Sequence, residues 1–197
     1  MQNYIEITLI KDSDISPYFV WSKLYTQLHL AFVQQKDTNE QIPYGVSFPE
    51  YKSVEIKGKQ LKLLGSKLRI FAESEQALQK LNLDRWLERL TDYVHIKSAK
   101  PVENVAQYLT VSRCRSQASA ENIARRYAKR HHISVEDALN RLEGFKQRLE
   151  DFPYIQLKSL SGNRDFSLCI KQTIVVEISI GLFSTYGLSA KSTVPHW

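Results

Sequence analysis

The chain has 197 residues, 43% of them hydrophobic and 24% charged, which is enough for one large domain or two small ones with a hydrophobic core. Its formal net charge of +6 favours an anionic partner. It has no basic and apolar leader and no run of about 18 apolar residues, so we expect a cytoplasmic protein that is neither secreted nor membrane-spanning.

The first half of the chain alternates strand-like and helix-like patterns. Ser16 is a suitable cap for the first helix, Pro17 fits its first turn, and the second helix is expected to break near Asn82. The expected elements are a strand over 3–10, a helix over about 17–35, strands over 45–48 and 67–72 joined by a lysine-rich loop, a helix over about 74–92 and a strand over 93–98. The order β-α-β-β-α-β predicts a ferredoxin-like domain over residues 1–99.

The second half, residues 100–197, is predicted to form a separate α+β domain, which makes the whole chain an α+β protein. Ser134 is expected to cap a helix, and Gly162–Asn163 to form a hairpin turn. The expected elements are an extended stretch over 107–112, helices over about 120–131 and 134–148, and strands over 154–159, 165–171, 175–180 and 183–187.

Positive charge is concentrated between Arg113 and Arg130. This stretch holds six Lys or Arg residues and one acid, a net +5 in a chain whose total is +6. At about 100° per residue, the helix expected over 120–131 carries four cations on one arc, opposite its apolar side: Arg125, Arg126, Lys129 and Arg130. No acids alternate with them to form i,i+4 pairs, so the pattern favours phosphate binding over an ordinary solvated face.

Candidate catalytic residues are few. His29 shares its helix side with apolar residues, and it is either a packed histidine at a domain seam or a general base, since imidazole titrates near neutral pH. The sequence allows two interpretations of Ser159, Ser161 and Tyr186: ordinary strand residues, or residues of a functional site. Phe166 is either a core residue or a ring on which a base stacks.

The sequence gives no sign of a metal or cofactor. Cys114 and Cys169 are the only cysteines, which suits a reducing cytoplasm and is too few for a metal site. Phosphate-binding glycine loops, CxxC and HExxH patterns and a G-x-S-x-G elbow are all absent from the sequence. We therefore expect neither a metal ion nor an organic cofactor.

Short motifs spread along nearly the whole chain resemble one family. They are KLYTQLH ending at His29, YGVSFP at 44–49, LRIFA at 68–72, WLERL at 86–90, VSR ending at Arg113, ARRYAKRH at 124–131, SLS at 159–161, Phe166, YGLS at 186–189 and VPHW at 194–197. In this order and spacing they resemble the Csy-type CRISPR-associated endoribonucleases, which process guide-RNA precursors in type I-F systems.

The resemblance implies an activity and its partners. The family cuts CRISPR repeat RNA at the 3′ base of a hairpin without metal, by attack of a ribose 2′-OH, and leaves a 2′,3′-cyclic phosphate. It keeps the product guide RNA as a subunit of a surveillance complex for antiviral defence. The expected partners are therefore the repeat hairpin and other type I-F subunits, with a monomer when free.

The resemblance also implies residue roles. His29 matches the catalytic histidine, Ser159 the serine that holds the attacking ribose, and Tyr186 the tyrosine that supports the active site. The expected RNA-binding residues are Arg113 for a guanine near the cut, Phe166 for the terminal base pair, Ser161, and the helix cations Arg125, Arg126, Lys129 and Arg130 for phosphates.

Three residues depart from the family pattern. Arg115 stands where glutamine is usual, which favours guanine or phosphate over adenine. Lys129 stands where arginine is usual, so a bidentate phosphate contact becomes a point-charge contact. The turn after Ser159 reads SLSGN rather than S-x-S-T-G.

Two other functions stay open at this point. One is a catalytically inactive module that binds an RNA hairpin. The other is a double-stranded DNA-binding protein that uses the basic helix as a recognition helix, although no clear helix-turn unit precedes that helix.

Overall fold

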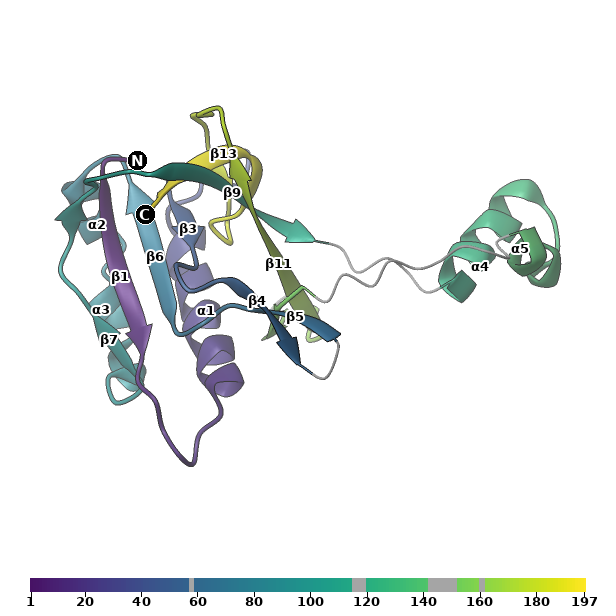
Figure 1. Ribbon diagram of the computed structural model, residues 1–197, viewed down its shortest axis with the longest axis horizontal. Helices are drawn as coiled ribbons and strands as arrows, with labels where there is room; N and C mark the ends of the chain where they lie inside the picture. The colour runs from purple at the N-terminus through teal and green to yellow at the C-terminus, as the bar shows by residue number, and fades with distance from the viewer. Residues whose placement is uncertain (57–58, 115–119, 142–151, 160–161) are drawn as a thin grey trace. The chain divides into compact units, whose positions relative to one another are not determined.

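The computed structural model describes residues 1–56, 59–114, 120–141, 152–159 and 162–197 (Figure 1). They form a mixed fold of helices and antiparallel strands that divides into two compact units, residues 1–114 with 152–197 and residues 115–151. The second unit is therefore an insertion into the first.

One sheet occupies the N-terminal part of the larger unit. Its strand order is β3-β6-β1-β7, each pair antiparallel, and β8 pairs with β1. The elements are β1 (Asn3–Leu9), α1 (Pro17–Val33), β3 (Gly45–Ser47), β6 (Lys67–Ala72), α2 (Glu75–Lys80), α3 (Leu83–Trp86), a 3₁₀ helix η1 (Glu88–Leu90), β7 (Val94–Ile96) and β8 (Lys100–Pro101). The register sets Ile5 opposite Ile70 and Ile7 opposite Leu68, all of them buried.

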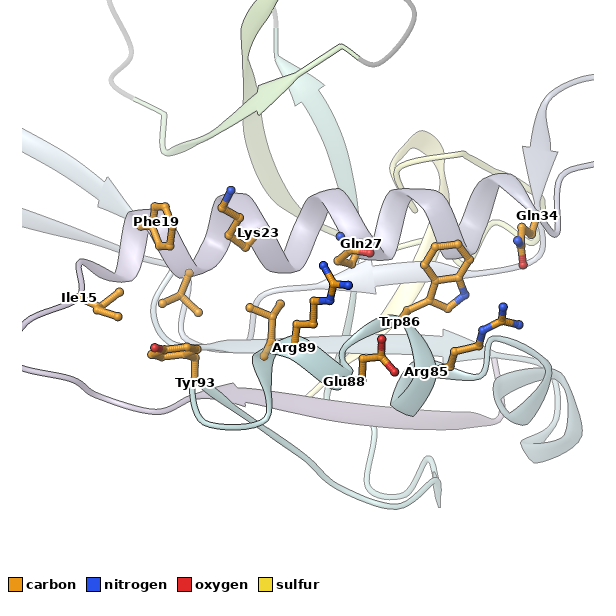
Figure 2. A pocket seen from close by; sticks show the side chains of 12 residues that line it. Ile15, Phe19, Lys23, Gln27, Gln34, Arg85, Trp86, Glu88, Arg89 and Tyr93 are labelled. Atoms are coloured by element: carbon orange, nitrogen blue, oxygen red, sulfur yellow. The ribbon is translucent and has the colours of Figure 1, made fainter.

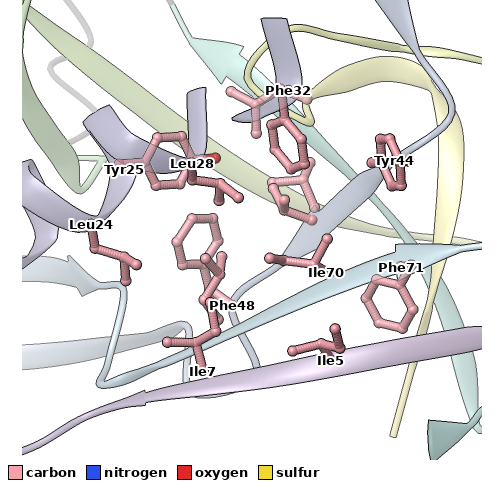
Figure 3. Close-up of a cluster of buried hydrophobic side chains, with 14 of the residues drawn as sticks. Ile5, Ile7, Leu24, Tyr25, Leu28, Phe32, Tyr44, Phe48, Ile70 and Phe71 are labelled. Carbon is pink, nitrogen blue, oxygen red and sulfur yellow. The ribbon is translucent and has the colours of Figure 1, made fainter. Parts of the chain in front are cut away.

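Helix α1 packs its apolar side onto this sheet. It begins as the sequence predicts, with the Ser16 hydroxyl accepting a hydrogen bond from the Tyr18 amide and Pro17 in the first turn. Figure 3 shows Leu24, Leu28 and their helix neighbours facing the side chains of β1 and β6. Burial of each large apolar side chain contributes about 1.5–3 kcal/mol, so this contact fixes α1 firmly on the sheet.

The predicted helix over 74–92 is three short helices, α2, α3 and η1. The break falls where the sequence places it, because Asn82 adopts a φ of 47°, in the left-handed region that asparagine tolerates better than most residues. The chain therefore turns between α2, which packs on β1 and β6, and α3, which packs on α1.

The lysine-rich loop expected between 48 and 67 is instead a two-stranded hairpin, β4 (Lys52–Ile56) with β5 (Lys59–Leu63). Apolar residues stand at every second position near the ends of both strands, Val54 and Ile56 on β4 and Leu61 and Leu63 on β5, and Val54 lies opposite Leu61. This alternation has the period of a strand. The high lysine content concealed it and made the prediction of a loop wrong.

A second sheet completes the larger unit, in the order β10-β11-β9-β13. Its strands are β9 (Gln107–Cys114), β10 (Tyr154–Lys158), β11 (Asp165–Val175) and β13 (Ser189–His196), while a separate pair joins β12 (Phe183–Ser184) to β2 (Gln41–Ile42). The predicted turn at Gly162–Asn163 connects β10 to β11, and the Ser159 amide donates to the Arg164 carbonyl across it. Both sheets share one hydrophobic core.

Three strand predictions in this region need correction. The strand expected over 165–171 extends to Val175 as β11, the strand expected over 175–180 is absent, and the strand expected over 183–187 is reduced to β12. Strand β13 was not predicted, since Pro195 and a run of small polar residues weaken its pattern. Among the described residues β13 pairs only with β9, and such an edge strand tolerates proline.

The two cysteines are joined. Cys114 on β9 and Cys169 on β11 are register partners, with their Cα atoms 5.2 Å apart, and they form a disulfide. The sequence did not indicate this pairing, because 55 residues separate the two cysteines and only the register of β9 and β11 brings them into opposition.

The smaller unit contains two described helices, α4 (Ala120–His131) and α5 (Val135–Arg141). Ser134 caps α5 as predicted, with its hydroxyl accepting from the Asp137 amide at 3.0 Å. The part of the predicted helix beyond residue 141 lies outside the described residues. None of the helices that the structure describes has the length and hydropathy needed to cross a membrane.

Candidate active site and cationic helix

A tight turn near the C-terminus carries Thr185 and Tyr186. The Gly187 amide donates to the Ser184 carbonyl at 2.7 Å, and the Ser184 amide donates to the Leu188 carbonyl at 2.9 Å. Gly187 has a φ of 70°, and a Cβ atom there would lie 2.6 Å from Val46 Cγ1. Glycine is thus required both by the backbone conformation and by the close approach of β3.

Helix α1 holds this turn through two residues one helical turn apart. The Tyr25 hydroxyl donates to the Tyr186 carbonyl at 2.9 Å, and His29 Nδ1 lies 2.8 Å from the Thr185 carbonyl oxygen. On the other side, the Val46 amide donates to the Gly187 carbonyl at 3.0 Å. The turn is therefore fixed between α1 and the edge of the first sheet.

The hydrogen bond to Thr185 sets the tautomer of His29. A carbonyl oxygen only accepts, so Nδ1 carries the hydrogen and Nε2 keeps its lone pair in the neutral ring. Burial lowers the pKa of His29 below its ordinary value, and the hydrogen bond opposes this shift in part. At neutral pH His29 is therefore an uncharged imidazole with Nε2 able to accept a proton.

Three rings and one guanidinium form a row that starts at His29. The His29 and Tyr186 rings are stacked with centroids 4.1 Å apart, and Tyr186 meets Phe166 edge to face at 6.3 Å. The Arg113 guanidinium lies 5.5 Å from the centroid of the Phe166 ring. These four residues come from α1, the C-terminal turn, β11 and β9. All four are predicted as site residues from the sequence, and the fold of the larger unit brings them together.

Tyr186 is the central member of this row. Burial raises the pKa of Tyr186, and the positive charge of Arg113 opposes that rise. The hydroxyl therefore stays protonated at neutral pH, and the ring supports both the imidazole and Phe166.

Ser159 lies just after β10, half-buried, and its hydroxyl accepts from the Gly162 amide at 3.2 Å. The end of β10 lies beside Phe166, because Phe166 is the register partner of Leu157. Ser161 and Arg115, which the sequence also predicts as site residues, lie outside the described residues.

The four helix cations lie in the smaller unit. Arg125, Arg126, Lys129 and Arg130 are all exposed on α4, whereas Ala124 and Ala128 on its other side are buried against Ala138 of α5. Within the described residues none of the four cations has an ion-pair partner. Within that part of the chain, α4 has the four cationic side chains exposed and its alanines buried.

The sequence did not identify two groups that contact this site, the Tyr25 hydroxyl and the Thr185 carbonyl. Tyr25 stands four residues before His29, and this i,i+4 spacing was a signal that both contact the same segment. The Thr185 carbonyl left no signal, because it is a backbone group 156 residues away from its partner. In the described part of the chain, His, Cys, Asp and Glu side chains form no group of three or more that could hold a metal ion.

Comparison of the amino-acid sequence with known proteins identifies a family. The family described as CRISPR-associated protein (Cas_Csy4) matches residues 4–197. A CRISPR-associated endonuclease Cas6/Csy4 of Escherichia coli (strain UTI89 / UPEC) is 31% identical over 196 residues, and one of Pseudomonas aeruginosa (strain UCBPP-PA14) is 32% identical over 196 residues, with 99% of each chain covered in both cases.

Among solved structures, "An RAMP protein binding different RNA substrates" aligns over 99% of both chains with a TM-score of 0.39 and 13% identity. A score and identity this low support no conclusion about function. The family match and the two relatives, each spanning almost the entire chain, are sufficient by themselves. The chain belongs to the Cas_Csy4 family of CRISPR-associated proteins.

Proposed function

We propose that this protein cuts CRISPR repeat RNA at the 3′ base of a hairpin, without metal, and retains the product guide RNA in a type I-F complex. By its family it is an endonuclease of CRISPR RNA maturation. The observation that carries the finer proposal is the row from His29 through Tyr186 and Phe166 to Arg113, which combines a neutral imidazole with a stacking ring and a cation.

The proposed chemistry uses a nucleophile that RNA already contains. His29 Nε2 takes the proton of the 2′-OH beside the scissile phosphate, and the 2′-oxygen attacks phosphorus. The bond from phosphorus to the 5′-oxygen breaks, and that oxygen takes up a proton. The products are a 2′,3′-cyclic phosphate and a 5′-OH end. The fixed tautomer and lowered pKa of His29 support its role as the base.

The remaining site residues position the RNA in this proposal. Ser159 orients the attacking ribose, and Tyr186 holds the imidazole in place. Phe166 stacks on the terminal base pair and Arg113 reads a guanine beside it, which the contact between these two side chains supports. We propose Ser161 and Arg115 as further RNA contacts.

The proposed RNA affinity comes mainly from α4. Its exposed cations Arg125, Arg126, Lys129 and Arg130 contact hairpin phosphates. We assign residues 1–99 as a ferredoxin-like domain, which the strand order β3-β6-β1-β7 supports, and residues 100–197 as the hairpin-binding domain with its arginine-rich helix. We propose that the protein is cytoplasmic and monomeric until it joins other type I-F subunits.

The test is cleavage of the repeat RNA in EDTA by the wild type and by His29→Ala. We expect the wild type to cut and His29→Ala to bind equally well without cutting. His95→Ala is the matched control, since this exposed histidine on β7 should leave cutting unchanged. Equal cutting by wild type and His29→Ala would remove His29 from its role.

Two modified substrates separate the alternatives. An RNA with a single 2′-deoxy nucleotide before the cut should bind and stay intact, because the nucleophile is missing. A DNA hairpin of the same sequence should bind far more weakly. Undiminished DNA affinity would favour a double-stranded DNA-binding protein, and wild type that binds RNA without cutting would favour an inactive binding module.

A further inference from the structure

A pocket of about 630 Å³ lies between α1 and the segment formed by α3 and η1 (Figure 2). It lies on the side of α1 away from His29: at about 100° per residue, Val20 and Gln27, which line it, are roughly 160–180° around the helix from the imidazole. None of the side chains in the row from His29 to Arg113 lines this pocket. It is therefore separate from the proposed catalytic site.

The pocket wall combines positive charge with aromatic rings. Lys23 of α1 and Arg85 and Arg89 of the opposite wall are exposed, and Glu88 is the single acid among the lining residues. None of these four side chains has an ion-pair partner in the part of the chain that the structure describes. The three cations outnumber the one acid, so the pocket is electropositive and favours an anionic ligand.

The rings stand beside these cations. Phe19 is 55% exposed, with the Lys23 ammonium 5.1 Å from its ring centroid, and the half-buried Trp86 lies between Arg85 and Arg89 in the sequence. Figure 2 shows Arg89 and Gln27 pointing toward one another across the pocket, and Trp86 near Gln34. Exposed rings beside cations are what proteins use to bind single-stranded nucleic acid, where bases stack and phosphates pair with positive charge.

The size and lining of the pocket narrow the choice of occupant. Its volume is that of a site for small molecules, which suits about one or two unpaired nucleotides and excludes a duplex. A bound amphipathic helix would instead need a continuous apolar surface. Here three cations and the amides of Gln27 and Gln34 interrupt the apolar lining.

We propose that this pocket binds unpaired nucleotides of the substrate RNA on the 3′ side of the cut. The inference rests on the proposed function, in which the hairpin occupies the 5′ side of the scissile phosphate at His29. A helix with its side chains is about 10–12 Å across. RNA that leaves the His29 face therefore reaches the pocket by crossing one helix.

The test compares two RNAs that cannot be cut, both with a 2′-deoxy nucleotide at the attacking position. One ends just after the scissile phosphate, and the other continues with an unpaired 3′ flank. We expect the wild type to bind the flanked RNA more tightly. Arg89→Ala and Trp86→Ala should each weaken binding of the flanked RNA about 5-fold or more and leave binding of the short RNA unchanged.

Two further variants control this experiment. Lys80→Ala removes an exposed cation from nearby α2 that does not line the pocket, and it should bind both RNAs like the wild type. Arg89→Glu reverses an exposed charge without removing packing, so it should weaken binding of the flanked RNA more than Arg89→Ala does. It tests the pocket even if Trp86→Ala fails to fold.

The outcomes separate this inference from the function on which it rests. If the wild type cuts its repeat RNA but Arg89→Glu binds both RNAs as the wild type does, the pocket proposal is wrong and the proposed function stands. Loss of binding to another type I-F subunit in Arg89→Glu, with no effect of the flank, would make the pocket a protein-docking site. If the wild type does not cut, the proposed function itself fails.

Discussion

At the residue scale, His29 and Tyr25 act on the same turn from one side of α1. His29 contacts the Thr185 carbonyl and Tyr25 contacts the next carbonyl, that of Tyr186. The ring of Tyr186 in turn stacks on His29. The imidazole is therefore held by a hydrogen bond in its plane and by a ring against its face, and Tyr25 fixes the backbone that carries that ring.

Tyr25→Phe should show how much this positioning matters. It removes the hydrogen-bond donor of the Tyr186 carbonyl, so we expect the free energy of unfolding to fall by about 0.5–1.5 kcal/mol. We also expect slower RNA cutting at saturating enzyme with unchanged hairpin affinity. Urea denaturation and single-turnover cleavage measure the two effects. Tyr18→Phe, at a site on the same helix that is 69% exposed, should change neither, and parallel losses in affinity and rate would contradict a positioning role.

The pH dependence of cutting should report the lowered pKa of His29. The neutral ring is the active form, so activity is present above the pKa and is lost as the pH falls through it. Because burial places that pKa below the ordinary 6.5 of imidazole, kcat/KM should exceed half its plateau value at pH 6.5 and fall tenfold per pH unit well below the pKa. A midpoint above 6.5 would show that the free enzyme does not hold His29 as the structure indicates.

At the element scale, the proposed function gives α4 and the row at His29 separate tasks. The helix supplies exposed cations without ion-pair partners among the described residues, whereas the row lies on β9, β11, α1 and the C-terminal turn of the other unit. Affinity should therefore respond to the helix, and the rate of the chemical step to the row.

Arg130→Ala tests the task of the helix. Removing one phosphate contact should lower hairpin affinity and reduce the slope of log affinity against log salt by about 1. Binding measured across a salt series gives that slope. Arg141→Ala, which removes an exposed arginine from α5 of the same unit, is the control and should leave it unchanged. A slope that Arg130→Ala leaves at the wild-type value would mean that this face of α4 does not contact phosphate.

The elements themselves show where sequence patterns suffice. Strand β1 and helix α1 were predicted closely, because each carries a regular apolar period and α1 also carries a cap. The strand predicted over 175–180 is absent although its apolar residues alternate, since Val176 and Ile180 are almost fully exposed there. The pairing of β11 with β9 ends at Val175 opposite Tyr108, close to where β9 begins. A local sequence pattern does not indicate where the partner strand ends.

The candidate site was predictable to a similar degree. His29, Phe166 and Tyr186 could be named from the sequence because of the family resemblance, and the structure brings these three into contact. Their mutual geometry could not be predicted. It depends on the close approach of Val46 to Gly187 and on carbonyl groups, which long-range packing places and no side-chain pattern encodes.

At the scale of the whole molecule, the smaller unit is an insertion with closely spaced ends. Cys114, at the end of β9, and Tyr154, at the start of β10, are both register partners of Cys169, one on each side of β11. Strands in a sheet are about 4.8 Å apart, so Cys114 and Tyr154, which flank the insertion, are roughly 10 Å from each other.

A variant in which a short Gly-Ser linker replaces residues 115–151 tests this arrangement. Three or four extended residues span about 10 Å, so the linker can close the gap without distorting β9 or β10. We expect the remaining chain to fold with a cooperative thermal transition and to lose at least about 100-fold in hairpin affinity, because the α4 cations are gone. A chain that no longer unfolds cooperatively would show that the larger unit needs the insertion for its core.

The position of both ends beside one residue of β11 has an evolutionary consequence. A segment joined to its host at two neighbouring points can be exchanged, lengthened or redesigned without moving the strands that carry it. Under the proposed function, a lineage whose CRISPR repeats drift in sequence can therefore acquire a new recognition segment while inheriting His29 and its surroundings unchanged. For the same reason, grafting the insertion of one relative into another is a direct route to a nuclease with a chosen hairpin.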